Sequence, residues 1–364
     1  MKRLVLRMLP LAAAALATFG YHNDAQAQRK LVYATYLTDV YAVTRADKWF
    51  MGEVEKRTNG KVKFETYYGG SLLKASDVMP GISGGAADIG MGAPTAYNRK
   101  NYPLSQVTLP FTTDRVDTAT RAFTELYGAN AALRKEFESK NLRLLYAMGF
   151  GENTIWSNKP LLKPADIKGL KVRAVLGIGD ALNKLGASTL AIPWPDAVEG
   201  MQRGVVDAMS GAPFDTGVDS GLHEVAKYAS DIGRMGVYAM ALTAVSLKTF
   251  NSLDADTQKV MLDVAKEVPE QYLKFVDEVF DSAAKKVAVR VAAGQLQVSS
   301  FSDADTKQMR DTIGSELWKE WYAVAKEAGV DGKELLDQYL ALVEKYNKTS
   351  THRPGLTRVT APKS

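Results

Sequence analysis

The chain of 364 residues contains no cysteine and only three histidines, and these absences exclude several kinds of chemistry. Without cysteine there is no thiolate nucleophile, no disulfide, no cysteine-ligated zinc and no iron–sulfur cluster. His22 lies in the N-terminal leader and His352 in the polar C-terminal segment, and His223 is expected to be a surface residue. A two-histidine metal site is therefore not available in the central part of the chain, and neither a metal nor a cofactor is predicted.

Catalytic motifs are also missing. No Gly-x-Ser-x-Gly sequence occurs, and no glycine-rich phosphate or dinucleotide motif follows a predicted strand. The carboxylates are scattered rather than paired. A protein that binds a ligand without catalysing a reaction fits this composition better than an enzyme does.

Charge is modest and unclustered. The formal net charge is +5, with 24% charged and 46% hydrophobic residues, as in a globular protein. A small positive charge suits anionic solutes but does not indicate a nucleic-acid partner. The length predicts two domains, and a monomer is expected.

The only marked apolar run lies at the N-terminus. Basic residues precede the stretch 8–19, which is too short to span a membrane well, and Ala25 and Ala27 supply a small-x-small cleavage pattern. Residues 1–27 are interpreted as a Sec-type signal peptide, the alternative being a membrane anchor. Export to the periplasm follows from this interpretation.

Strand and helix patterns alternate along the rest of the chain. Residues 62–66 alternate as a half-buried strand, and 117–127 carry apolar residues on one helical face. The alternation predicts an α/β fold with a largely parallel sheet. A single helix is predicted from about 254 to 293, long enough to run along more than one domain. Helices near 303–328 and 333–346 follow, and residues 349–364 are expected to be a loose tail.

The segment 164–173 is the most informative, and its sequence is PADIKGLKVR. Further segments follow it or precede it in a fixed order: LGA at 185–187, IPWPD at 192–196, MQRGVVD at 201–207, HEVAKY at 223–228, GAADIG at 85–90 and LPF at 109–111. This ordered set resembles the solute receptors of TRAP (tripartite ATP-independent periplasmic) transporters over nearly the whole chain.

The resemblance implies two α/β lobes with a ligand cleft between them and a long helix spanning both. Lobe I would comprise residues 28–151 and about 238–280, and lobe II residues 152–237 and about 281–348. The implied function is to bind a small organic carboxylate and deliver it to membrane permease subunits, without enzymatic activity. Alternatives are an ABC-type or sensor-linked binding protein and a periplasmic enzyme acting on an organic acid.

The resemblance also implies roles for individual residues. Arg173 occupies the position of the family's carboxylate-binding arginine, where a planar, permanently charged donor would compensate a buried carboxylate; the alternative is an exposed arginine at a strand end. Trp194 matches an aromatic wall of the cleft or else packs in the core. Tyr36, near Tyr41, and Thr95 lie where strand-end loops of the other lobe would meet the ligand.

The sequence departs from the family pattern at two places. Asn153 stands where many relatives carry a second arginine, and Glu152 precedes it, either as a hydrogen-bond acceptor for the ligand or as a solvated charge. The segment after Asp207 lacks the family's asparagine and runs through Phe214, a further candidate for ligand binding. One arginine, an amide and aromatic residues suit a monocarboxylate better than a dicarboxylate.

Overall fold

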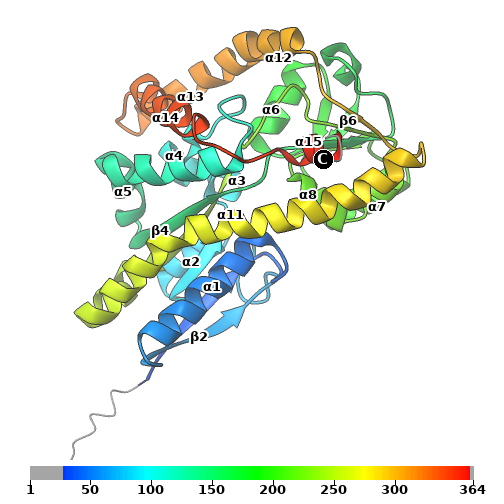
Figure 1. Cartoon of the computed structure of the whole chain (residues 1–364). Coiled ribbons are helices and arrows are strands. Elements are labelled where there is room, and N and C mark those ends of the chain that lie inside the picture. The colour runs from blue at the N-terminus through cyan, green and yellow to red at the C-terminus, as the bar shows by residue number, and fades with distance from the viewer. Residues whose placement is uncertain (1–27, 193, 361–364) are drawn as a thin grey trace, which may run out of the picture.

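The computed structural model describes residues 28–192 and 194–360, so the predicted signal peptide lies outside the described residues. The chain forms two separate β-sheets flanked by helices (Figure 1). The predicted two-lobed α/β fold is confirmed, with one lobe built on each sheet. Within the described ranges, no helix is long and apolar enough to cross a membrane.

The first sheet has five strands in the order β2-β1-β3-β10-β4. Their bounds are Arg29–Thr35 for β1, Val62–Tyr67 for β2, Ile89–Gly92 for β3, Leu142–Gly149 for β4 and Met240–Ser246 for β10. β1 pairs in parallel with β2 and β3, whereas β10 is antiparallel to both β3 and β4. The sheet is therefore mixed, because a strand from late in the chain is inserted between two early ones.

The second sheet has six short strands in the order β11-β9-β5-β8-β6-β7. Their bounds are Ile155–Ser157 for β5, Lys171–Arg173 for β6, Ser188–Leu190 for β7, Ala208–Met209 for β8, Tyr228–Ser230 for β9 and Gln297–Ser299 for β11. β6 is parallel to β7 and β8, and β5 is antiparallel to β8 and β9. Two short connections, residues 150–154 and 231–239, carry the chain between the sheets, and a third, helical connection leads from β10 to β11.

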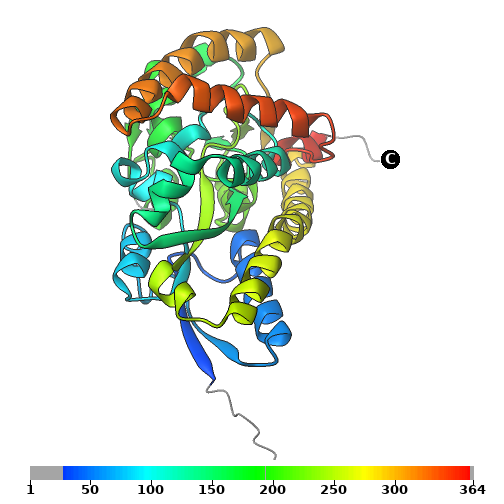
Figure 2. The ribbon, with the colours of Figure 1, turned by 90° about the vertical axis from the view of Figure 1, so that its left-hand side faces the viewer.

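Helices cover both sheets (Figures 1 and 2). The first sheet and its surroundings carry α1 (Ala42–Arg57), α2 (Val78–Gly84), α3 (Pro94–Tyr97), α4 (Val116–Ala129), α5 (Ala131–Glu138) and α10 (Leu247–Asn251). The second carries α6 (Leu176–Lys184), α7 (Trp194–Gln202), α8 (Phe214–Asp219) and α9 (Leu222–Val225). Late in the chain, α12 (Asp303–Met309) continues through a π-helical turn, Arg310–Gly314, into α13 (Ser315–Glu327), and α14 (Gly332–Asn347) follows.

The long helix predicted from the sequence is α11 (Ala255–Ala292), with 38 residues. It begins at the N-cap Asp254, whose side chain accepts the Thr257 N–H at 2.9 Å. Its first half packs with the core of the first sheet, and Ala283 and Val287 pack with that of the second. At 1.5 Å per residue it is roughly 57 Å long, and both views show it running past the two sheets.

Two expectations about the end of the chain differ from the structure. Residues 281–348 were expected to belong to lobe II, but Trp321 and Tyr339, on α13 and α14, share a hydrophobic cluster with Phe123 and Phe137 of the first lobe. The reason is a contact between distant segments: α14 packs on α4, and α13 packs on α14, with Trp321 Nε1 donating to the Pro103 carbonyl at 2.8 Å.

The segment expected to be a loose tail is packed instead. Within it, α15 (Gly355–Thr360) lies against α11 and α8, and Leu356 is buried. Arg358 pairs with Asp277 at 2.6 Å and Asp281 at 2.7 Å, both on α11. Figure 1 shows this segment crossing the molecule from α14 to α15. Polar composition was misleading here, because the anchors are a few ion pairs and one leucine.

A buried carboxylate ties α1 to the first sheet. Asp47 is fully buried and accepts hydrogen bonds from the hydroxyls of Tyr33 at 2.6 Å, Tyr146 at 2.7 Å and Thr243 at 2.9 Å. Burial raises the pKa of Asp47 from 3.8 to about 6, and the three hydroxyl groups oppose that rise. The folded protein therefore binds this proton more tightly than the unfolded chain does.

This linkage predicts a pH-dependent contribution to stability. The contribution of Asp47 is fully present below its unfolded pKa of 3.8 and is lost as the pH rises through the folded value of about 6. The free energy of unfolding of wild type relative to Asp47→Asn should therefore fall by on the order of 2–3 kcal/mol between pH 4 and pH 7. Urea denaturation at both pH values measures it, with the exposed Asp303→Asn as control. A difference that does not change with pH would contradict the prediction.

Candidate functional site

A cavity of about 690 Å³ lies between the two lobes. The first lobe contributes aromatic side chains after β1 and β4, from α3 and before β10, and α11 contributes two more. These aromatic lining residues are Tyr36, Tyr41, Tyr97, Phe150, Tyr238, Tyr272 and Phe280. The second lobe contributes Arg173, Val175, Ile192 and the segment 211–213, followed by Asp215 and Thr216. The wall is thus mostly apolar with a few polar groups, as is usual for small-molecule sites.

Arg173 is the last residue of β6, and only 5% of it is exposed. Its Nε donates to the Ile192 carbonyl at 3.1 Å, and Nη1 donates to the Ser210 carbonyl at 3.1 Å. These contacts hold the guanidinium plane against one wall of the cavity. Burial lowers the pKa of Arg173 from its ordinary value, with Tyr238 and Tyr97 opposing, but an arginine remains charged.

The backbone next to Arg173 needs a glycine. Gly211 has φ +80°, and a Cβ there would lie 3.1 Å from Val175 Cγ2 and 3.3 Å from Arg173 Nη1. The loop after β8 can therefore pass close to the guanidinium only because it lacks a side chain at this residue.

Tyr36 and Thr95 were both predicted to contact the ligand, and the structure places them differently. Tyr36 lines the cavity and packs edge-on against Tyr97, with ring centroids 5.3 Å apart. Thr95 is 5% exposed, is not one of the described lining residues, and its hydroxyl has no hydrogen-bond partner within the described chain. Its neighbours Ala96 and Tyr97 line the cavity instead.

Phe214 also faces away from the cavity. Its fully buried ring stacks on Trp156 with centroids 6.0 Å apart and an interplanar angle of 16°. Gly217, one turn later, sits so close to this indole that a Cβ would lie 2.2 Å from Trp156 Nε1. The residues that α8 presents to the cavity are Asp215 and Thr216, which the sequence did not single out.

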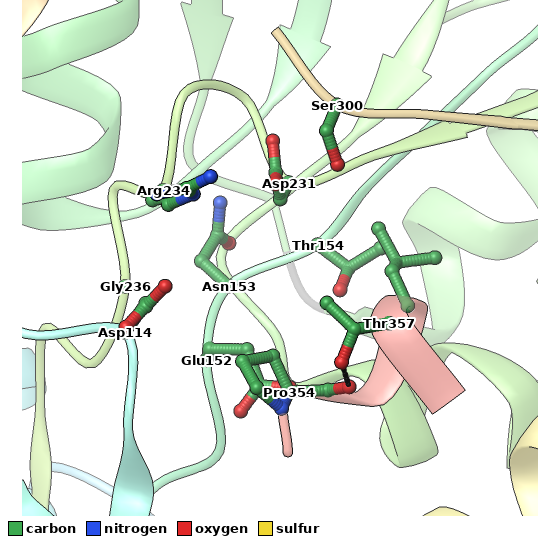
Figure 3. A pocket seen from close by; sticks show the side chains of 11 residues that line it. Asp114, Glu152, Asn153, Thr154, Asp231, Arg234, Gly236, Ser300, Pro354 and Thr357 are labelled. Carbon is green, nitrogen blue, oxygen red and sulfur yellow. Dashed lines mark hydrogen bonds between the residues drawn. The ribbon is translucent and has the colours of Figure 1, made fainter. Parts of the chain in front are cut away.

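Glu152 and Asn153 line a second, smaller cavity of about 60 Å³ (Figure 3). Asn153 accepts the Gly211 N–H at 2.7 Å and donates to Ser210 Oγ at 3.0 Å, so it supports the loop beside Arg173 from behind. Glu152 is not the solvated charge that was one alternative, because only 4% of it is exposed. It accepts the Gly355 N–H, and Figure 3 shows Pro354 of the tail beside it.

Two further expectations concern Trp194 and the histidines. α7 begins at Trp194, but the side chains of residues 194–196 lie outside the described part, so its predicted role stays a prediction. His223 is 8% exposed rather than a surface residue, and burial lowers its pKa. Across residues 28–192 and 194–360, no group of histidine, aspartate and glutamate could hold a metal ion.

Two lobes joined by crossing segments, with a cavity lined from both, define the class of two-lobed solute-binding proteins. The chain belongs to the bacterial extracellular solute-binding proteins, family 7, whose family model matches residues 33–324. This places it among the substrate-binding proteins of TRAP transporters, as the sequence motifs predicted, and implies an extracytoplasmic location.

Characterised relatives and solved structures agree with this assignment. The 2,3-diketo-L-gulonate-binding periplasmic protein of Escherichia coli K12 is 25% identical over 315 residues, covering 84% of this chain and 93% of that protein. A TRAP periplasmic solute-binding protein from Desulfovibrio salexigens superposes with a TM-score of 0.79 at 28% identity, covering 90% of this chain and 99% of that one. A TRAP solute-binding protein from Rhodoferax ferrireducens, solved with benzoate, shares the fold with a TM-score of 0.74 at 21% identity, covering 88% and 99%.

Proposed function

We propose that this protein is the periplasmic receptor of a TRAP transporter and that it binds a small organic monocarboxylate. The observation that carries the proposal is the buried Arg173 guanidinium on the wall of an otherwise largely apolar cavity. A buried carboxylate is stable only beside a fixed positive partner, and arginine offers a two-pronged donor. Aromatic rings around it supply apolar contact for the rest of the ligand.

The assignment of the ligand class has independent support from related proteins. Relatives are named for 2,3-diketo-L-gulonate, for ectoine and for monocarboxylate 2-oxoacids, each of which carries a carboxylate. The residue that could have favoured a dicarboxylate, a second arginine at position 153, is an asparagine engaged with Ser210 and Gly211. One guanidinium therefore serves one carboxylate.

The wider setting of the proposal is delivery to a membrane permease. Residues 1–27 would direct export and be removed, and the lobes of the monomer would close on the ligand by a hinge movement of the crossing segments. The ligand-bound form would then dock on the permease subunits. The protein itself would carry out no reaction.

A thermal-shift screen tests the function. The chain from residue 28 is unfolded and refolded to remove carried-over ligand, and is then heated with a panel of 2-oxo, 2-hydroxy, aromatic, sugar and C4-dicarboxylic acids. Tight binding to the folded state stabilises it by about 2.7 kcal/mol at a ligand concentration of 100 Kd, so a monocarboxylate should raise the Tm by several degrees. The uncharged carboxamide of each hit is the control. If no acid raises the Tm, or if the amide works equally well, the proposal fails.

A further inference from the structure

Besides Arg173, an acidic side chain lines the main cavity. Asp215 lines the cavity although only 6% of the residue is exposed. One of its carboxyl oxygens, Oδ1, has no hydrogen-bond partner within the described chain. A buried acceptor without a donor costs free energy, so such groups in native proteins usually meet a partner supplied by water or a ligand.

The packing behind Asp215 fixes its position. Phe214 is locked between Trp156 and Phe280, with ring centroids 6.0 Å and 6.1 Å away. Because Gly217 has no side chain, the next turn of α8 packs directly against the indole of Trp156. The backbone that carries Asp215 therefore has little freedom to turn the carboxyl group elsewhere.

Within the described chain, the charged side chains that act most on Asp215 are themselves acids. Burial raises the pKa of Asp215 to about 7, and the negative charges of Asp219 and Glu152 add to the rise, while the Thr216 backbone opposes it. A donor supplied from the cavity would relieve this unfavourable environment.

Arg173 and Asp215 mark two different polar regions of one cavity. Burial raises the pKa of Tyr97 and of Tyr238, and the charge of Arg173 opposes that rise. Burial also raises the pKa of Tyr41 and of Tyr272, and the charge of Asp215 instead adds to that rise. Apolar side chains complete the wall, among them Phe150, Val276 and Phe280. Such a cavity is complementary to a molecule with an anionic end, an apolar body and a donor at the far end.

We propose that Asp215 determines ligand specificity by selecting carboxylates that carry a second hydrogen-bond donor remote from the carboxylate group. The donor is a hydroxyl, an amide N–H or an ammonium group. This inference rests on the proposed function, since it assigns the far end of the ligand whose carboxylate Arg173 binds. It narrows the proposed ligand class to monocarboxylates that carry a hydrogen-bond donor.

Matched ligand pairs test the inference by isothermal titration calorimetry. Each pair contains a plain acid and the same acid with one added donor: straight-chain acids of increasing length with and without a terminal hydroxyl or amino group, and benzoate with 3-hydroxybenzoate. Wild type should prefer the donor-bearing member of at least one pair by about 10- to 100-fold, as expected for a hydrogen bond to a charged group. Asp215→Asn should reduce that preference to within about threefold.

The ratio within a pair separates specificity from mere structural damage, because a disturbed fold would weaken both members alike. Glu136→Gln is the matched control: it removes a buried acid of α5 that lines neither cavity, and it should leave the ratio unchanged. If wild type binds the plain acids but shows no preference, or if Asp215→Asn keeps the preference, the inference is wrong while the proposed function stands. If neither member of any pair binds, both are overturned.

Discussion

Replacing Arg173 with alanine should weaken binding of the cognate acid by at least about 100-fold, because the ligand carboxylate would then be buried without a charged partner. Only 5% of Arg173 is exposed, and its guanidinium is already oriented by the carbonyls of Ile192 and Ser210. Little of the binding free energy is therefore spent on ordering it. Calorimetric titration with the best acid from the thermal-shift screen measures the loss directly.

Arg173→Lys distinguishes the roles of charge and shape. Lysine keeps the positive charge but cannot offer two parallel donors in one plane, so its affinity should fall between those of wild type and Arg173→Ala. Arg203→Ala, at an exposed position after α7, is the control for loss of an arginine and should bind like wild type. Unchanged affinity in Arg173→Ala would refute the assignment of Arg173 as the carboxylate-binding residue.

Replacing Gly236 with alanine should destabilise the protein by about 2–5 kcal/mol, more than any surface substitution. Gly236 lies in the crossing segment 231–239 with φ +74°, where L-residues are strained. An added Cβ would lie 2.1 Å from the Thr113 carbonyl oxygen, a backbone atom that cannot swing aside. The Gly236 carbonyl accepts the Asn153 N–H of the other short connection, so the strain would reach both short connections between the lobes.

A fall in Tm of roughly 5–15 °C is expected for Gly236→Ala, measured without ligand by circular dichroism. Gly128→Ala in α4 is the control, because nothing lies within 4 Å of its added Cβ and alanine favours helix. It should leave the Tm unchanged or raise it slightly. An equally small change in both variants would show that the crossing segments accommodate a side chain.

Local patterns were sufficient to predict most of the lobe architecture. The alternation over residues 62–66 and the four-and-three spacing of apolar residues over 254–293 correspond to β2 and α11, within one or two residues at the ends. β10 was not predicted. All seven of its residues are buried, so the strand has no alternation to detect, and its antiparallel insertion depends on partners far away in the sequence.

The site was harder to predict than the fold, and the difficulty has a physical cause. Arg173 stands in an ordered motif at a strand end, and it lies on the cavity wall. Phe214 and Asp215 are neighbours, and which of them faces the cavity depends on the stacking of Phe214 on Trp156, a contact between distant segments. The burial of Glu152 also depends on a contact between distant segments, because its hydrogen-bond partner Gly355 belongs to the C-terminal tail.

The insertion of β10 between β3 and β4 has a consequence for how the chain acquires its structure. A polypeptide is made from its N-terminus, and until residues 240–246 emerge, the facing edges of β3 and β4 have no strand to pair with. Unpaired, apolar strand edges tend to associate with other chains. The first lobe therefore cannot complete itself as synthesis proceeds, and a fragment ending near residue 151 should aggregate rather than fold. Folding of the first lobe must wait for most of the polypeptide, which favours a chain that is kept extended until it is complete.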